Sequence, residues 1–325
     1  MKYRHGTGIK TEDGLHLMSW GGTRFEGKPF FVLKYFPEKN GERTKNRTSY
    51  SKVKPPLYAY NEMIDTAEEF DEDYVSYSDL LDRKIVRVPE DKIEKIIDPV
   101  EKANKIIEDP SDSVEKEFET VHSFFSDLMN RKEIDLEIGV TASLLFGLHD
   151  PDSSDIDIIF YGDSENVEKL LEEIKGLVEK GTLELELSDF EKNVVEETMD
   201  TDLTESLREK LVDEKRYLSS FHYEKTSLEI HLMFARPEIN HDITDGNGKG
   251  RTSLEGTITD KSSSKYVCPR FKVKKDREST VICYHKSGAV VKQGDNVSLS
   301  GYKVVEGDRE LILQLDERQD YLRVK

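Results

Sequence analysis

Residues 139–162 read "GVTASLLFGLHDPDSSDIDIIFYG", and the fold that we expect depends on this stretch. Its second half is an apolar run with the alternation of a β-strand, in which Ile156 and Ile158 point into the fold. Asp155 and Asp157 then share the opposite face, about 6.5 to 7 Å apart by strand rise, and repel each other unless a cation lies between them. Mg²⁺ prefers oxygen ligands and usually takes one or two protein carboxylates. The run therefore predicts a strand that carries half of a magnesium site.

The first half of the stretch predicts the complementary anion site. "GVTASLLFG" leaves a strand and enters a helix through small residues. Backbone N–H groups at such a helix start, with the Ser143 hydroxyl beside them, can hold phosphate oxygens, and small side chains let a phosphate approach the backbone. A phosphate site and a cation site are thus expected close together.

The flanking sequence predicts an α+β protein with three regions. Residues 1–110 begin with short aromatic-rich strands and continue as helix, and the run "EDKIEKIIDPVEKANKIIED" predicts one or two helical pieces broken near Pro99. Residues 111–240 alternate helix and strand and hold the motif, which makes them the expected mixed-sheet core flanked by helices. The Gly-, Asn- and Asp-rich run "NHDITDGNGKGR" predicts a linker, and residues 250–325 predict a small β-barrel, of which the oligonucleotide-binding type is one candidate.

Charge is distributed unevenly along the chain. The formal net charge is −19, yet residues 1–60 carry 12 Lys and Arg against 5 Asp and Glu, and residues 251–325 carry 15 against 11. Acidity argues against nucleic acid as a partner only for the central part, because phosphate neutralisation by basic residues supplies most non-specific affinity. The basic ends are compatible with an RNA or DNA partner, and equally with solvated surfaces.

Other classes of protein are excluded by simpler observations. No run reaches the ~18 to 20 apolar residues of a membrane span, and the N-terminus lacks the apolar core of a signal peptide, so we expect a cytoplasmic protein with no membrane partner. Two cysteines, Cys268 and Cys283, are too few for a disulfide framework or a zinc cage, and two reduced thiols are favoured over a cross-strand disulfide between them. The oligomeric state is left open.

The motif resembles the nucleotidyltransferases of the DNA polymerase beta superfamily. These share a Gly-Ser or Gly-Gly turn at a helix start, followed about ten residues later by a strand with Asp-x-Asp, and the leading "SDID" adds to the likeness. The layout is similar to archaeal members with an N-terminal strand-rich region and a C-terminal β domain. One residue departs from the pattern, since Ala142 stands where the family has Gly. An alanine fits if the backbone φ there is negative and is strained if it is positive.

The resemblance implies a set of roles. Asp155 and Asp157 would hold two Mg²⁺ ions, and the turn from Thr141 through Ala142 to Ser143, with Ser154, would bind the triphosphate of an NTP. The superfamily's third carboxylate is predicted at Glu229, the one acid within the apolar run "TSLEIHLMFA", where it would be a further metal ligand and would position or deprotonate an acceptor hydroxyl.

One alternative to the assignment of Glu229 remains. The alternating run "TLELELS" offers Glu184 and Glu186 on one face, although a solvated edge strand explains them more simply, and His231 is expected to orient or pack beside Glu229.

Two functions follow from the resemblance. The first is a Mg²⁺-dependent transfer of NMP from an NTP to a hydroxyl of a nucleic acid end or a protein, with release of pyrophosphate. The second is a non-catalytic nucleotide- or nucleic-acid-binding protein with a degenerate core, which Ala142 favours and the two strand aspartates oppose.

Overall fold

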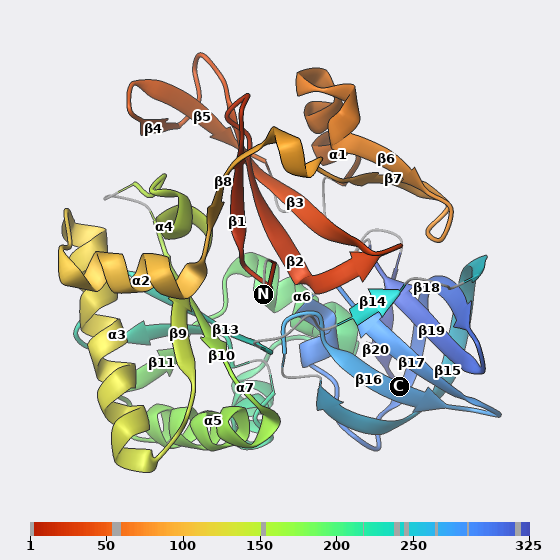
Figure 1. Cartoon of the computed structure of the whole chain (residues 1–325). Coiled ribbons are helices and arrows are strands. Elements are labelled where there is room, and N and C mark those ends of the chain that lie inside the picture. The colour runs from red at the N-terminus through yellow and green to blue at the C-terminus, as the bar shows by residue number, and fades with distance from the viewer. Residues whose placement is uncertain are drawn as a thin grey trace.

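The computed structural model describes residues 3–53, 60–150, 154–216, 218–236, 241–243, 247–263, 266–284, 286–315 and 320–325. It is an α+β protein with three larger sheets, and the N-terminal sheet, the helix-covered central sheet and the C-terminal barrel lie against one another (Figure 1). The expected α+β class with a C-terminal barrel is confirmed at this level.

The central sheet has five strands in the order β11-β12-β13-β10-β9. β10 runs parallel to β13 in the middle, and the other neighbours are antiparallel. The strands are β9 (Glu137–Val140), β10 (Ile156–Tyr161), β11 (Leu183–Leu185), β12 (Ser220–Tyr223) and β13 (Glu229–Ala235). The parallel pair joins segments about 70 residues apart in the chain, because parallel strands need a long crossover connection, which usually contains a helix.

Helices cover the central sheet because their apolar stripes match its apolar face. They are α2 (Pro99–Glu108), α3 (Ser113–Lys132), α4 (Ala142–Phe146), α5 (Ser164–Glu179), α6 (Asp189–Met199) and α7 (Glu205–Asp213). Apolar residues of α3 and α5 share one core with Ile156, Ile158 and Phe160 of β10, and Phe125 of α3 is in ring contact with Phe160. Asp155 and Asp157 therefore lie away from the helix-covered face, as the alternation predicts.

The N-terminal sheet has the order β4-β5-β3-β2-β1-β8, with β14 added beside β2. Its strands are β1 (Gly8–Thr11), β2 (His16–Phe25), β3 (Lys28–Pro37), β4 (Arg43–Lys45), β5 (Thr48–Lys52), β8 (Ile93–Ile97) and β14 (His241–Ile243). Helix α1 (Tyr60–Phe70) and the hairpin of β6 (Val75–Ser78) and β7 (Arg83–Val86) pack on this sheet, with single helical turns at Glu72–Tyr74 and Glu90–Lys92.

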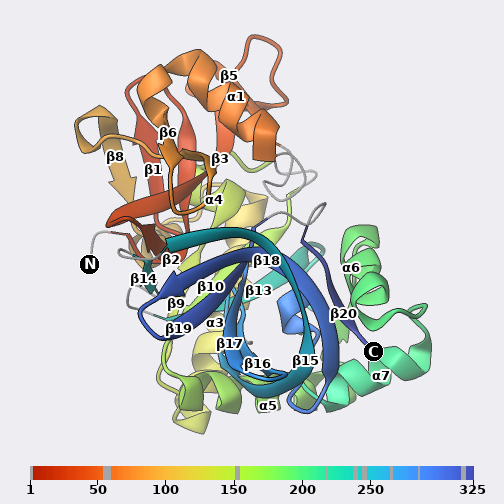
Figure 2. The same cartoon turned by 90° about the vertical axis from the view of Figure 1, so that its right-hand side faces the viewer.

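The C-terminal strands form a closed five-stranded barrel, which Figure 2 shows end-on. The strands are β15 (Asn247–Ser263), β16 (Arg270–Lys274), β17 (Glu278–Cys283), β18 (Asn296–Glu306) and β19 (Arg309–Gln314), and pairing of β15 with β18 closes the ring. β20 (Leu322–Val324) pairs with the first part of β18, at residues 297–299. A helical turn, η3, spans Lys286–Ala289. Cys268 and Cys283 are free thiols, as expected.

Two predictions about local structure were wrong. The run 90–109 was expected to form one or two helical pieces broken near Pro99, but Ile93–Ile97 form strand β8, which pairs with β1. Helix α2 begins only at Pro99, where Asp98 accepts hydrogen bonds from the Val100 and Glu101 amides. The expected linker over 240–251 is strand in its described parts, because β14 joins the N-terminal sheet and β15 begins at Asn247.

Candidate functional site

The two aspartates lie at the start of β10, where it meets β9 on one side and β13 on the other. The Asp157 side chain is 15% exposed and that of Asp155 is 38% exposed. Repulsion from Asp157, followed by burial, raises the pKa of Asp155. Burial also opposes ionisation of Asp157, but the His231 hydrogen bond and nearby lysine charges outweigh it and lower the pKa of Asp157. Ionisation of the first carboxyl group is thus favourable and ionisation of the second is opposed, as expected for two carboxylates that share a site.

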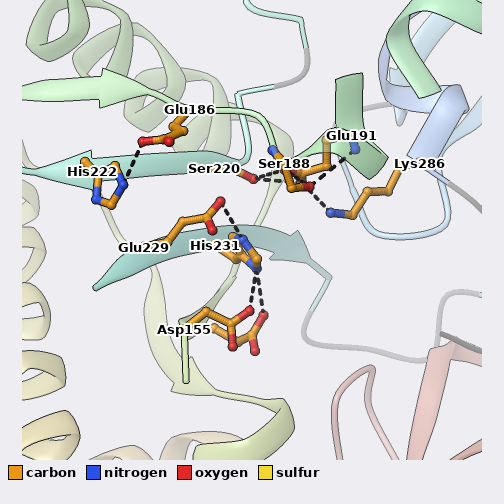
Figure 3. Close-up of polar contacts among 10 residues, drawn as sticks. Asp155, Glu186, Ser188, Glu191, Ser220, His222, Glu229, His231 and Lys286 are labelled. Atoms are coloured by element: carbon orange, nitrogen blue, oxygen red, sulfur yellow. Dashed lines mark hydrogen bonds and ion pairs between the residues drawn. The ribbon is translucent and has the colours of Figure 1, made fainter. Parts of the chain in front are cut away.

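His231 stands between these aspartates and Glu229 (Figure 3). It lies opposite Asp157 in the parallel β10–β13 register. Its Nδ1 is 3.3 Å from Asp155 Oδ2 and 3.4 Å from Asp157 Oδ1, and its Nε2 is 3.0 Å from Glu229 Oε1. Burial lowers the pKa of His231, but the contacts with Asp157 and Glu229 prevail and raise it to about 10. The His231 imidazole is thus paired with all three carboxylates.

The carboxylates and the imidazole form two sets of potential metal donors that share His231. Among the described residues, donor atoms within 4.8 Å of one another occur in the set Asp155, Asp157 and His231 and in the set Glu191, Glu229 and His231. Glu229, predicted as the third ligand, therefore belongs to the same cluster but reaches the aspartates through His231.

The turn predicted to bind phosphate carries a strained residue. Ala142 has φ of +49° and is the first residue of α4, which has only five residues. The left-handed region costs an alanine about 1 to 2 kcal/mol, a penalty that glycine does not incur. Thr141 is 1% exposed and Ser143 is 5% exposed, and both hydroxyls lack a hydrogen-bond partner within the part of the chain that the structure describes. The Thr141 amide donates to the Asp157 carbonyl at 3.0 Å, which fixes this turn beside the aspartates.

Ser154 has a structural partner in the N-terminal sheet. Its hydroxyl accepts a hydrogen bond from the Asp150 amide at 2.8 Å and lies 3.3 Å from the Arg43 guanidinium, which also pairs with Asp150 at 3.4 Å. Lys45 donates to the Phe146 carbonyl at the end of α4. Two basic residues of the β4–β5 hairpin thus hold the ends of the loop between α4 and β10, instead of lying free in solvent.

Two lysines outside the sequence motif act electrostatically on the aspartates. Lys34 of β3 and Lys52 of β5 both lower the pKa of Asp157, and Lys52 also lowers that of Asp155. Burial, then the charge of Lys52, lowers the pKa of Lys34 to about 8. Within the described ranges, neither ammonium group has a hydrogen bond or an ion pair of its own. Both cations are available to an anion that enters the site.

A buried glutamate connects the site to the barrel. Glu191 of α6 is 1% exposed, and it accepts hydrogen bonds from the Ser220 hydroxyl at 2.7 Å and from Lys286 of η3 at 2.5 Å (Figure 3). Burial opposes its ionisation, but Lys286 prevails and lowers the pKa of Glu191. The sequence indicates only one role for Glu191, a capping box with Ser188 at the start of α6. Its proximity to Glu229 and His231 cannot be read from the sequence, because these residues are far from it in the chain.

The rival carboxylates lie at the edge of the central sheet, Glu184 on strand β11 and Glu186 directly after it. β11 ends the sheet order, Glu184 is exposed, and Glu186 pairs with His222 at 2.6 Å. Figure 3 draws no polar contact between this pair and the cluster around His231, although His222 lies opposite Glu229 in the β12–β13 register.

No family model, curated protein or solved structure matches this chain. No helix within the described ranges is long and apolar enough to cross a membrane.

Proposed function

We propose that the protein is a metal-dependent nucleotidyltransferase, with Mg²⁺ as the ion that the sequence resemblance implies. It would transfer NMP from an NTP to an acceptor hydroxyl and release pyrophosphate. The observation that carries the proposal is the meeting of three features at one end of three adjacent strands: Asp155 and Asp157 at the start of β10, Glu229 and His231 on β13, and the turn that begins α4 after β9.

The donor set fits a divalent cation. Asp155 and Asp157 offer hard carboxylate oxygens, and their mutual repulsion is the kind of strain that a cation relieves. A bound divalent ion would supply positive charge that neutralises phosphate oxygens on the attacking and leaving sides.

The chain's own residues would perform the remaining steps. Lys34 and Lys52 would attract the triphosphate, because a polyanion cannot otherwise approach four carboxylates. The unpartnered hydroxyls of Thr141 and Ser143 would donate to phosphate oxygens. Glu229 would take the proton of the acceptor hydroxyl as its oxygen attacks the α-phosphorus, while the bond to the pyrophosphate oxygen breaks.

The acceptor in this proposal is a nucleic acid end or a protein hydroxyl. The basic N-terminal sheet and the barrel would contact an RNA or DNA acceptor, with the barrel acting as an oligonucleotide-binding module. A cytoplasmic location agrees with this use of NTPs and with the two free thiols.

One observation favours the second candidate, a binding protein that performs no transfer. The positive φ of Ala142 means that the turn requires the conformation glycine adopts without strain, yet an alanine methyl group is present there. If that methyl group keeps the triphosphate away from the backbone, nucleotide binding would be retained only in part and transfer would be lost.

Label transfer tests the proposal. The full chain is incubated with Mg²⁺ or Mn²⁺ and each α-labelled NTP, with and without bulk RNA, and label in macromolecular product is measured. We expect transfer that disappears in Asp157→Asn and persists in the matched control Asp127→Asn, which alters an exposed aspartate of α3. Nucleotide binding without transfer to any acceptor would refute the enzyme and leave the binding protein.

A further inference from the structure

His231 is placed as a metal ligand would be, on the same side of the sheet as the two aspartates. Its Nδ1 faces both carboxylates at almost equal distances, 3.3 and 3.4 Å. Adjacent ligand atoms of an octahedral ion with bonds near 2.1 Å are about 3 Å apart. Both nitrogen–oxygen distances are thus close to the spacing of neighbouring ligands in a coordination sphere. All three donor atoms lie within 4.8 Å of one another, and all three side chains are only partly buried.

Glu229 occupies the position of an outer carboxylate. Its Oε1 is 3.0 Å from His231 Nε2, the ring nitrogen that points away from the aspartates. The two atoms form an ion pair, and the angle between them falls short of a hydrogen bond. Metal-binding histidines almost always present their second ring nitrogen to a carboxylate, carbonyl or water, which fixes the tautomer and the ring orientation. The same order occurs here, because His231 presents one ring nitrogen to the two aspartates and the other to Glu229.

The second donor set, formed by Glu191, Glu229 and His231, already has a lysine as a counter-charge. Glu191, which would complete a set with Glu229 and His231, accepts hydrogen bonds from Ser220 and Lys286. One ion between the aspartates and His231 is therefore the arrangement that the charges favour.

From this geometry we infer that Asp155, Asp157 and His231 hold a divalent ion of the transition-metal class, with Mn²⁺ as the probe, and that Glu229 orients His231 instead of binding the ion. Imidazole is a favourable ligand for first-row transition ions, whereas Mg²⁺ prefers oxygen. The inference rests on the proposed function for what the ion does, but not for its binding. It changes the predicted ligand set by replacing Glu229 with His231.

Ion binding to the full, metal-stripped chain tests this inference by calorimetry, without any transfer reaction. We expect Mn²⁺ to bind at least about tenfold more tightly than Mg²⁺. His231→Gln should remove most of this preference, and Glu229→Gln should weaken Mn²⁺ binding by about 10- to 100-fold, the usual effect of losing an outer-shell partner. The matched control is His222→Gln. His222 lies on the neighbouring strand β12 and also pairs with a glutamate, Glu186, but within the described ranges it contacts no aspartate pair.

A spectroscopic measurement on the unmodified protein guards against variants that fail to fold. Electron spin-echo spectra of the Mn²⁺ complex should contain modulation from an imidazole nitrogen. Absence of that modulation, equal affinity for Mn²⁺ and Mg²⁺, or an unchanged preference in a folded His231→Gln variant would each overturn the inference. A chain that binds Mn²⁺ as expected but transfers no label would refute the proposed function and leave this inference standing.

Discussion

Acidification from pH 7.0 to 5.5 should weaken the N-terminal sheet through one buried histidine. His5 is fully buried, and its Nδ1 accepts a hydrogen bond from the Gly21 amide at 2.6 Å, which requires an unprotonated nitrogen. Burial, assisted by the charge of Lys34, lowers the pKa of His5 to about 3. The His5 carbonyl also accepts the Tyr161 hydroxyl at the end of β10, so this position connects the sheet to the strand that carries the aspartates.

The size of the effect follows from the unfolded chain. A histidine whose folded pKa is lowered costs no stability well above the unfolded pKa of about 6.5, and destabilises the fold progressively as pH falls from there towards the folded pKa. Between pH 7.0 and 5.5 the unfolded histidine becomes mostly protonated while His5 stays neutral. The loss is about 1.3 kcal/mol, and it is the same for any folded pKa well below 5.5.

Urea unfolding followed by Trp20 fluorescence measures this loss of stability with a probe beside His5. Trp20 is the chain's single tryptophan, and its ring lies 5.2 Å from the His5 ring. The comparison is His5→Asn, whose Oδ1 can accept the Gly21 hydrogen bond and does not titrate. Other titrating groups cancel in the difference, so the wild type should lose about 1.3 kcal/mol more than the variant. Equal losses would refute the argument that His5 is held neutral.

Three further predictions concern the site. Lys34→Gln should weaken Mg²⁺–NTP binding about tenfold in calorimetry, because a charge-assisted contact is lost. The control Lys28→Gln, at the exposed far end of the same strand, should leave the affinity unchanged, and equal effects of the two substitutions would refute a specific role for Lys34. Ala142→Gly should raise the free energy of unfolding by up to about 1 kcal/mol, because relief of left-handed strain exceeds the added chain entropy; destabilisation in thermal melts would contradict the strain. Lys286→Met should lower it by about 1 kcal/mol by removing a partly exposed partner of buried Glu191, and an unchanged melting temperature would count against that contact.

Local patterns were sufficient to predict the parts of the fold that local forces determine. The alternation after Asp155 predicts β10, and the small residues after Val140 predict the helix turn that follows β9. Residues 90–97 misled because Ile93, Ile96 and Ile97 have the spacing of a helix face. Their strand conformation comes from pairing with β1 at the edge of the N-terminal sheet, which no local pattern records.

The site was only half predictable for the same reason. Asp155 and Asp157 are neighbours in the sequence, so their spacing is visible there. The contact of His231 with them depends on the parallel register of β10 and β13, which is set by the packing of the whole central sheet. An imidazole on the same face as Glu229 is visible in the run "TSLEIHLMFA", but its position between the carboxylates is not.

The uneven charge of the chain has a counterpart at the site. The aspartates belong to the acidic central region, whereas Lys34 and Lys52 belong to the basic N-terminal sheet and Lys286 to the basic barrel. All three lysines act electrostatically on a carboxylate of the cluster. An isolated central sheet would therefore present four carboxylates with His231 as their described counter-ion, and a polyphosphate would be repelled from it. If the site binds a polyphosphate as proposed, the N-terminal sheet and the barrel must therefore be assembled on the central sheet, because they supply Lys34, Lys52 and Lys286.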